Sequence, residues 1–519
     1  MSPFSAAARN PSKAAFSSPR AWASSASSNP AVACRGIRSD NVKIRINSLL
    51  NMSFDQVYRP AGRAYSSTMK HSTETMREAV AAVFVYQDEL FVIRRQPWLR
   101  AFPGYLAFPG GKVDGADREG GIDHPLLQPF QPVLVEALRR ELLEELGYDL
   151  GQALERGEVL SVDRVGTAVT PPFERVRFSA HHFRIRLRRR PRFRPDHEEI
   201  AWGGWVDRRA LWQEFRQGRH LMVVAMRNLV AAMAREGTAA QVHPFNLVYD
   251  PERELPVLEL IAGIGSIPVP SNTLPPARFT NALLIGDEGS PRCLVDPSPE
   301  SPEVLKRLLA TLETRPPDRL LITHHHPDHH QFAPEIARRL GIPLLCTPVT
   351  ARRLGTLFGE GYLEGVELHL LDEGDQVTRW LDRPVLTHRL PGHDDGMIGL
   401  APAGGPWFFV SDLIQTLGTV VIPEPEGDMQ AYFDSLQRVI DRRPEVVIPS
   451  HGMPAGGTWL LEQTLEHRRV RERQIRELHA AGNDQEQMLD IIYRGLDPAL
   501  RPLAAQNLRQ HLRKLGYGA

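Results

Sequence analysis

The chain has 519 residues, 42% of them hydrophobic and 24% charged, a composition typical of folded globular domains. The length predicts two or three domains, and the equal numbers of basic and acidic residues exclude binding to polyanions through overall charge. The three cysteines, Cys34, Cys293 and Cys346, are odd in number and far apart, which argues against a disulfide framework and for a reducing, cytoplasmic compartment. No apolar run reaches the roughly 18 residues of a membrane-spanning helix, so no membrane partner is expected.

Residues 1–75 differ in composition from the rest of the chain. They are rich in Ser, Ala and Arg, and up to position 70 their only acidic residues are Asp40 and Asp55. We expect a disordered extension, or upstream sequence before a true start at Met69 or Met76, rather than a targeting segment. The composition is also that of a mitochondrial transit peptide, and a mitochondrial location would follow if the extension serves as one.

The first folded domain is expected at residues 76–250. Two apolar runs, Ala79–Tyr86 and Leu90–Arg95, are predicted to form a hairpin. A helix is predicted over Glu136–Tyr148, with Gly147 as its stop signal. One or two further helices over 212–236 would close the domain. A charged stretch broken by a proline, residues 249–254, is expected to link it to the next domain.

Three glutamates share one face of the predicted helix. Glu141, Glu144 and Glu145 stand at positions i, i+3 and i+4. Carboxylates this close repel one another unless a divalent cation lies among them, and hard oxygen ligands favour Mg²⁺ or Mn²⁺. The alternative is a solvated acidic helix face, which is common in Glu-rich helices. The preceding Gly110-Gly111 and the run Arg-Glu-Leu-x-Glu-Glu-x-Gly favour the metal site.

Together, the glycine pair and this run resemble a Nudix box. The resemblance implies an α/β/α sandwich that cleaves a diphosphate attached to another group, with Mg²⁺ or Mn²⁺ held by the three glutamates. It also implies that Arg140 orients the carboxylates and that Gly111 shapes the loop entering the helix, so Glu145 and Arg140 are the expected catalytic residues. The sequence departs from the box at Pro132, where a Glu normally stands eight residues before the Arg, and an insertion at residues 116–131 separates its halves.

A long insertion inside the box resembles the coenzyme A diphosphatase branch of Nudix hydrolases. Short flanking matches support the resemblance, namely Arg94, Arg95, Thr170-Pro171-Pro172 and Arg177-Phe178. A further ligand or base is expected at Glu198 or Glu199, unless these are surface residues. The alternating run Arg184-Ile185-Arg186-Leu187-Arg188 predicts a strand with one basic face. That face would meet substrate phosphates, or else protect an exposed edge strand.

The second domain is expected at residues 255–460, and its central feature is a histidine-rich stretch after the apolar run 319–322. His324, His326, Asp328 and His329 stand in the order His-x-His-x-Asp-His. This spacing directs two imidazoles at one cation and passes an Asp and a His to a second. Imidazole and carboxylate together suit Zn²⁺ and, less selectively, Fe or Mn. The alternative is a loop that binds metal adventitiously.

Three later strand ends each deliver another ligand. His393, Asp412 and His451 follow strand-like runs. With the histidine-rich stretch they resemble the metallo-β-lactamase fold superfamily, which implies an αββα fold of two packed sheets with helices outside. Asp296-Pro297-Ser298 and Ser411-Asp412 depart mildly from the usual Asp-x-Gly and Gly-Asp of that family.

The resemblance also implies a ligand set and a mechanism. One ion would be held by His324, His326 and His393, a second by Asp328, His329 and His451, with Asp412 as the bridge. A dinuclear metal-bound hydroxide would attack an ester or thioester, and Asp328 is an expected catalytic residue. The motifs leave the bond open, because thioester, phosphodiester and lactam hydrolysis all use such a site.

Residues 461–519 are predicted to be helical. With residues 260–460 they resemble the group containing beta-lactamase-like protein 2, which has a small winged-helix-like tail and includes members that cut single-stranded RNA. From position 461 onward the chain carries 10 Lys and Arg against 8 Asp and Glu, so the segment is not strongly basic. A lid over the metal cleft is the preferred alternative to nucleic-acid binding.

Two function classes follow. The first is a bifunctional metal-dependent hydrolase: its Nudix half would split a nucleoside-diphosphate-linked compound, with a CoA-like molecule favoured, and its other half an ester or thioester such as an acyl-CoA. The second is a single-stranded RNA endonuclease with an accessory Nudix module. Small molecules are the expected partners of the first class, and RNA of the second.

Overall fold

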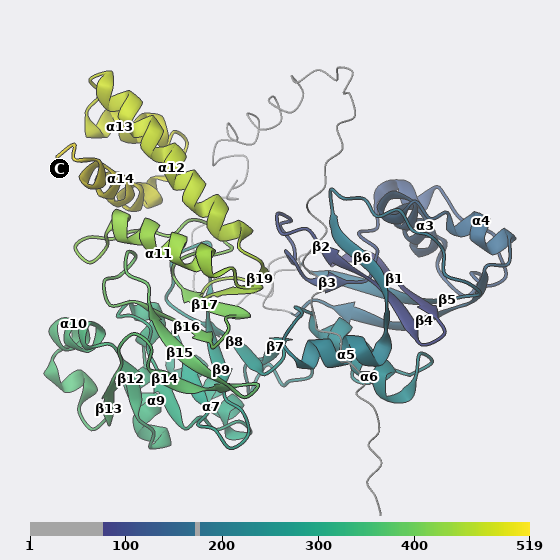
Figure 1. Ribbon diagram of the computed structural model, residues 1–519, viewed down its shortest axis with the longest axis horizontal. Coiled ribbons are helices and arrows are strands. Elements are labelled where there is room, and N and C mark those ends of the chain that lie inside the picture. The colour runs from purple at the N-terminus through teal and green to yellow at the C-terminus, as the bar shows by residue number, and fades with distance from the viewer. Residues whose placement is uncertain (1–75, 172–176, 519) are drawn as a thin grey trace, which may run out of the picture. The chain divides into compact units, whose positions relative to one another are not determined.

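The computed structural model describes residues 76–171 and 177–518 (Figure 1). The expected N-terminal extension and Pro172 of the flanking motif lie outside the described residues. The described residues fall within one compact unit of the chain. Among them, no helix combines the length and the apolar character that crossing a membrane requires.

The first domain is built on a mixed sheet in the order β3-β2-β1-β5-β4, with β6 also paired to β2. The predicted hairpin is confirmed, and β1 pairs in parallel with β5 on its other side. The strands are β1 (Arg77–Tyr86), β2 (Glu89–Arg95), β3 (Leu106–Ala107), β4 (Val159–Val169), β5 (Phe178–Leu187) and β6 (Ile200–Asp207).

Helices cover both faces of this sheet because successive side chains of its strands point to opposite sides. Phe84 packs on α3 (Pro132–Leu146) and α4 (Leu150–Glu155), while Val83 packs on α5 (Arg208–Arg216) and α6 (Val224–Glu236). The predicted helix starts four residues before Glu136, at Pro132, and proline is suited to the first turn of a helix. It ends before Gly147, whose φ of 60° is the left-handed conformation of a helix stop. The layers form the expected α/β/α sandwich.

The edge-strand form of the prediction for β5 is wrong, and the substrate-facing form is wrong for Arg184, whereas for Arg186 and Arg188 it stays a prediction. β5 lies between β1 and β4, so it is not an exposed edge. Arg184 is 5% exposed and is paired with Asp163 at 2.5 Å. It also donates to the carbonyl oxygens of Thr238 and Ala240. Its guanidinium is thus fully engaged inside the domain and does not face a substrate.

Two sheets packed face to face form the second domain. The first has the order β13-β12-β11-β10-β9-β8-β7 and the second β14-β15-β16-β17-β18-β19. The strands of the first are β7 (Leu258–Ile261), β8 (Ile264–Pro270), β9 (Phe279–Ile285), β10 (Cys293–Val295), β11 (Arg319–Leu321), β12 (Leu344–Cys346) and β13 (Leu368–Leu370). Those of the second are β14 (Gln376–Trp380), β15 (Arg383–Arg389), β16 (Ile398–Pro402), β17 (Trp407–Ser411), β18 (Val446–Pro449) and β19 (Ala455–Gly456).

Buried apolar residues fill the space between these sheets, with Leu321 from the first and Phe409 from the second in one cluster. The outer face of the first sheet packs on α7 (Pro302–Glu313) and α9 (Ala333–Leu340), and that of the second on α11 (Met429–Arg442). The αββα prediction is therefore confirmed. Helix α8 (Pro327–His330) contains the end of the histidine-rich stretch. Helix α10 (Pro348–Phe358) follows β12.

The C-terminal part of the chain is helical, as predicted. It consists of α12 (Trp459–Ala480), α13 (Gln485–Ile492), a short 3-10 turn (Pro498–Leu500) and α14 (Arg501–Leu515), drawn in yellow tones in Figure 1. These helices share a small hydrophobic core, to which α12 contributes Ile475, α13 Leu489 and α14 Leu508.

Candidate active sites

The histidine-rich stretch leaves the sheet at the end of β11 and turns into α8. His324 and His326 lie in the connecting segment, whereas Asp328 and His329 lie in the first turn of α8. His393 follows β15, Asp412 follows β17 and His451 follows β18. These strands end on the same side of the two sheets, and the seven predicted ligands therefore meet.

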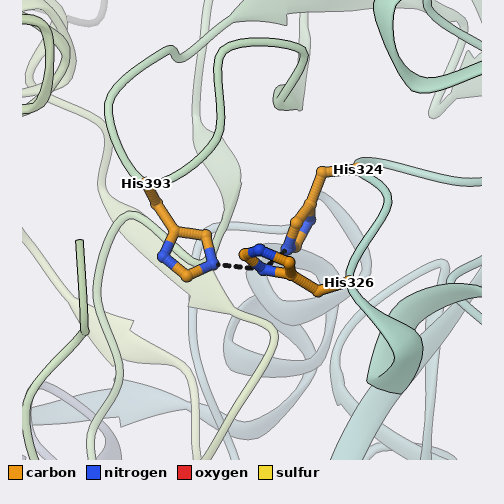
Figure 2. Close-up of side chains that lie close together, drawn as sticks. All are labelled: His324, His326 and His393. Carbon is orange, nitrogen blue, oxygen red and sulfur yellow. Dashed lines mark hydrogen bonds between the residues drawn. The ribbon is translucent and has the colours of Figure 1, made fainter. Parts of the chain in front are cut away.

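Three imidazoles form the first group (Figure 2). Nδ1 of His326 lies 3.0 Å from Nε2 of His324 and 2.8 Å from Nε2 of His393. Burial holds the pKa of His324 well below its usual range and lowers that of His393 to about 4, so both rings are neutral. Neutral imidazoles are the protonation state that binds a metal ion.

The proton positions of two of these rings test whether a cation fits. Nδ1 of His393 lies 2.7 Å from the carbonyl oxygen of Val421, so it carries the proton and Nε2 keeps its lone pair. Nε2 of His326 lies 3.3 Å from the carboxylate of Glu426, which favours the proton on Nε2 and, in the neutral ring, leaves the lone pair on Nδ1. The two lone pairs face each other at 2.8 Å and repel unless a cation lies between them. The donor set therefore fits a metal ion.

Asp328, His329, Asp412 and His451 form the second group. Nε2 of His451 lies 3.3 Å from Asp328 and 3.4 Å from Asp412, and Nε2 of His329 lies 3.4 Å from Asp412. Asp412 also lies 3.6 Å from Nε2 of His393, so it reaches both groups, as expected of a bridge. Among the described residues, Nε2 of His329 and Oδ1 of Asp412 are buried without a hydrogen-bond partner, which also fits a bound cation.

The two departures from the family pattern both make hydrogen bonds at this site. Ser298, in place of a glycine, donates to the carbonyl oxygen of Pro327 at 2.8 Å and accepts from the amide of Gln331 at 3.1 Å, so it ties down both ends of α8. Ser411, at the other departure, lies 2.9 Å from the hydroxyl of Thr323. Both serines thus add side-chain hydrogen bonds around the ligands.

Asp296 is a functional residue that the sequence showed only as part of a motif. It is fully buried, and its carboxylate accepts from Thr323 at 2.8 Å and lies 2.9 Å from Nδ1 of His329. A carboxylate on the outer nitrogen fixes the ring orientation and makes the inner nitrogen a better ligand. The signal was present in the sequence, because a lone Asp ended the buried strand β10.

The glutamates of the first domain are arranged less tightly. Glu145 is 5% exposed and accepts from the amide of Gly110 at 2.8 Å, whereas the side chain of Glu144 is 59% exposed. A Cβ on Gly111 would lie 2.4 Å from Oε1 of Glu141, so a larger residue there would displace that carboxylate. Among the described residues, the close groupings suited to a metal ion all lie in the second domain. The glutamates share a face, as expected, but do not converge on one point.

Burial controls the charge of the inner glutamates. It raises the pKa of Glu145 to about 8 and also raises the pKa of Glu141. The negative charge of Glu199 adds to both shifts. A bound cation would reverse these shifts, since it favours the carboxylate form.

Asp117, which the sequence did not single out, is an acidic partner of Arg140. Its oxygens lie 2.9 Å from Nε and 3.0 Å from Nη2 of Arg140, and it is 2% exposed. The same guanidinium reaches Glu141 at 3.0 Å and Glu144 at 3.1 Å, so Arg140 does orient two of the carboxylates. Asp117 is much nearer in the sequence to Gly111 than to Arg140. Counting forward from Gly111 therefore leads to Asp117, whereas counting backward from Arg140 leads to Pro132.

We expect Asp117→Asn to destabilise the first domain and slow its reaction. The change weakens a two-fold, largely buried charge-assisted pair, which is worth about 1.5–3 kcal/mol. It also frees Arg140 to move, and a shift of about 1 Å in catalytic groups can cost 10²-fold in rate. Chemical denaturation and diphosphatase kinetics check both effects. Asp114→Asn is the matched control, because its exposed carboxylate lies 3.8 Å from Arg140, and equal losses in both variants would contradict the assignment.

Comparison with known proteins identifies the domains. Family models match as the NUDIX domain over residues 75–227, the Metallo-beta-lactamase superfamily over 275–451, and the Beta-lactamase associated winged helix domain over 485–516. The chain is therefore a fusion of a Nudix domain with a metallo-β-lactamase domain and a C-terminal winged-helix domain. Both larger domains belong to hydrolase families, so the protein is a hydrolase with two hydrolytic modules.

Individual relatives match parts of the chain. A Beta-lactamase-like protein 2 homolog of Drosophila melanogaster is 28% identical over 257 residues, which are 46% of this chain and 82% of that protein. A Hydroxyacylglutathione hydrolase of Fuscovulum blasticum is 31% identical over 178 residues, covering 34% of this chain and 64% of that protein. A beta-lactamase domain protein from Burkholderia ambifaria has a TM-score of 0.43 at 22% identity and covers 53% of this chain and 91% of its own.

Proposed function

We propose that the protein is a bifunctional metal-dependent hydrolase. Its Nudix domain, residues 76–250, would cleave a nucleoside-diphosphate-linked compound related to coenzyme A. Its metallo-β-lactamase domain, residues 255–460, would hydrolyse an ester or thioester, and residues 461–519 would form the helical tail. The observation that carries the second activity is the close approach of the inner nitrogens of His326 and His393, which lie 2.8 Å apart beside the second ligand group.

In the second domain, the ligands fall into two groups, and each group would hold one ion. His324, His326 and His393 would hold one, Asp328, His329 and His451 the other, and Asp412 would touch both. Zn²⁺ suits this mixture of imidazole and carboxylate, with Fe or Mn as less selective alternatives. When bound, the ions supply Lewis acidity and lower the pKa of a coordinated water.

Hydrogen-bond acceptors of the protein hold the outer ring nitrogens of the histidine ligands. Val421 and Glu426 accept the protons of His393 and His326, and Asp296 accepts that of His329. The carbonyl oxygen of Phe279 accepts from Nδ1 of His451 at 2.9 Å. These contacts orient the inner nitrogens toward the ligand positions, and no side-chain nucleophile is needed.

In the Nudix domain, Glu141, Glu144 and Glu145 would hold Mg²⁺ or Mn²⁺. Arg140 keeps Glu141 and Glu144 in place, and the amide of Gly110 holds Glu145. The cations would neutralise the diphosphate, so positioning and electrostatics would supply most of the rate. The CoA-like preference rests on the insertion and the flanking motifs of the sequence.

The charges of α14 favour a small acyl substrate over RNA. Its cations are all paired: Arg501 with Glu486 and Asp490, Arg509 and Arg513 with Glu424, and Lys514 with Glu472. A helix that bound RNA would need cations free for phosphates. The hydroxyacylglutathione hydrolase relative is named for an acyl substrate, which agrees with the acyl proposal.

The test is a mixed incubation of acyl-CoAs with a short single-stranded RNA, in the presence of Mg²⁺ and Zn²⁺, followed by mass spectrometry of the products. We expect free CoA and phosphopantetheine species, an intact RNA, and a rate of CoA release that changes little with added salt. Binding along a phosphate backbone would weaken steeply with salt. RNA fragments with untouched acyl-CoA would overturn the proposal in favour of the nuclease.

A further inference from the structure

One loop connects the first ligand group to the C-terminal helices. This segment, residues 420–427, contains neither helix nor strand, so no backbone ladder fixes its position. Two of its oxygens nevertheless set the proton positions of metal-facing rings. The carbonyl of Val421 lies 2.7 Å from Nδ1 of His393, and the carboxylate of Glu426 lies 3.3 Å from Nε2 of His326.

Helix α14 holds this segment along most of its length. The side chain of Asn507 accepts from the amide of Ile422 at 2.9 Å. Gln510, which is 1% exposed, donates to the carbonyl oxygens of Pro423 at 3.2 Å and Gly427 at 2.8 Å. These side chains thus replace the backbone partners that a strand would have given the segment.

Charged contacts add to the hydrogen bonds of the segment. Glu424 pairs with Arg509 at 2.8 Å and with Arg513 at 2.7 Å, both from α14. Arg468 of α12 donates to the carbonyl oxygen of Val420. On the ligand side, Arg353 of α10 lies 3.8 Å from Glu426. The segment is therefore held between the tail on one side and the two histidines on the other.

We infer that the C-terminal tail is a positioning element of the His324/His326/His393 site. By fixing residues 420–427, α14 holds the acceptors that keep the protons of His393 and His326 on their outer nitrogens. If the segment moves, these rings rotate or change tautomer, and their inner nitrogens no longer meet. The inference rests on the proposed function, because it concerns the affinity of that site for a metal ion.

The alternative is that the tail matters only for folding, since α14 also packs Leu508 and Leu512 into the tail's own core. The test therefore changes only contacts to the segment. Gln510→Met removes two hydrogen bonds at nearly constant volume, and Glu424→Gln weakens both ion pairs at a partly exposed position. Gln506→Met is the matched control, because Oε1 of Gln506 has no partner among the described residues.

Co²⁺ is the probe, titrated into metal-free full-length protein and followed by its visible absorption, with thermal unfolding measured in parallel. We expect Gln510→Met and Glu424→Gln to weaken one of the two Co²⁺ sites about tenfold, within the range for partners of metal ligands. The other site and the control should match wild type.

Two outcomes would overturn the inference, and they differ in what else they affect. If wild type binds Co²⁺ and both variants bind it equally well, the tail has no positioning role and the proposed function stands. If wild type takes up no Co²⁺ at either site, the proposed function fails and the inference fails with it. Should Gln510→Met not fold, Glu424→Gln alone decides, because its side chain is partly exposed.

Discussion

Replacing His324 with alanine is expected to abolish acyl hydrolysis and leave diphosphate cleavage intact. His324 is fully buried in the first ligand group, and its loss removes one of three nitrogens around a single point. Losing the ion forfeits several kcal/mol of charge stabilisation, or about a thousandfold in rate. Parallel assays of CoA release from acyl-CoA and of phosphopantetheine release from CoA measure the two activities.

The control for this change is His369→Ala, which removes an exposed histidine of β13 that pairs with Glu367. It should behave as wild type in both assays. The picture of two separate centres would be wrong if His324→Ala silenced diphosphate cleavage in a protein that still unfolds at the wild-type temperature.

Replacing Glu145 with glutamine is expected to have the converse effect: diphosphate cleavage is lost and acyl hydrolysis is kept. An amide has nearly the shape of the carboxylate but lacks the charge that a divalent cation requires. Because removing a metal ligand forfeits several kcal/mol, we expect a fall of about a thousandfold. Initial rates at saturating Mg²⁺ with CoA as substrate check this.

Glu145 also makes a pH-dependent contribution to stability in the absence of metal. Burial raises its pKa from 4.5 to about 8, so the folded state binds this proton more tightly than the unfolded state does. Stability should therefore fall as pH rises from 4.5 to about 8, and Glu145→Gln should lack this part of the fall. Denaturation in a chelator at several pH values measures it. The exposed Glu155→Gln should keep the wild-type pH dependence, and a fall of equal size in Glu145→Gln would contradict the burial argument.

The sequence predicted most of the fold and the convergence of the ligands, because both depend on local patterns. His324, His326, Asp328 and His329 lie in one run of six residues, and the other ligands each follow a buried strand. Residues at strand ends on the same edge of packed sheets come together whatever lies between them. Whether these residues bind metal ions stays a prediction.

Features that depend on distant contacts could not be predicted in this way. Asp117 reaches Arg140 across an insertion, so counting back from the helix misses it. Val421 acts through its backbone carbonyl, which no side-chain motif reveals. Arg184 alternates with apolar residues as a basic surface strand would, yet tertiary pairing with Asp163 draws it inside.

The amino-acid composition of the C-terminal tail also could not predict its role. The small excess of cations left nucleic-acid binding open as a prediction, with a lid as the preferred alternative. The ion pairs of α14 are tertiary contacts, since Arg509 and Arg513 both bind Glu424. Tertiary contacts thus give these cations a partner inside the chain.

Metal content tests the central claim most directly. Wild type, His324→Ala and Glu145→Gln would be loaded with Zn²⁺, dialysed and measured by inductively coupled plasma mass spectrometry. We predict two retained Zn²⁺ ions per chain in wild type and in Glu145→Gln, and fewer in His324→Ala. Equal Zn²⁺ content in wild type and His324→Ala would contradict the account, because the first ligand group would then hold no ion.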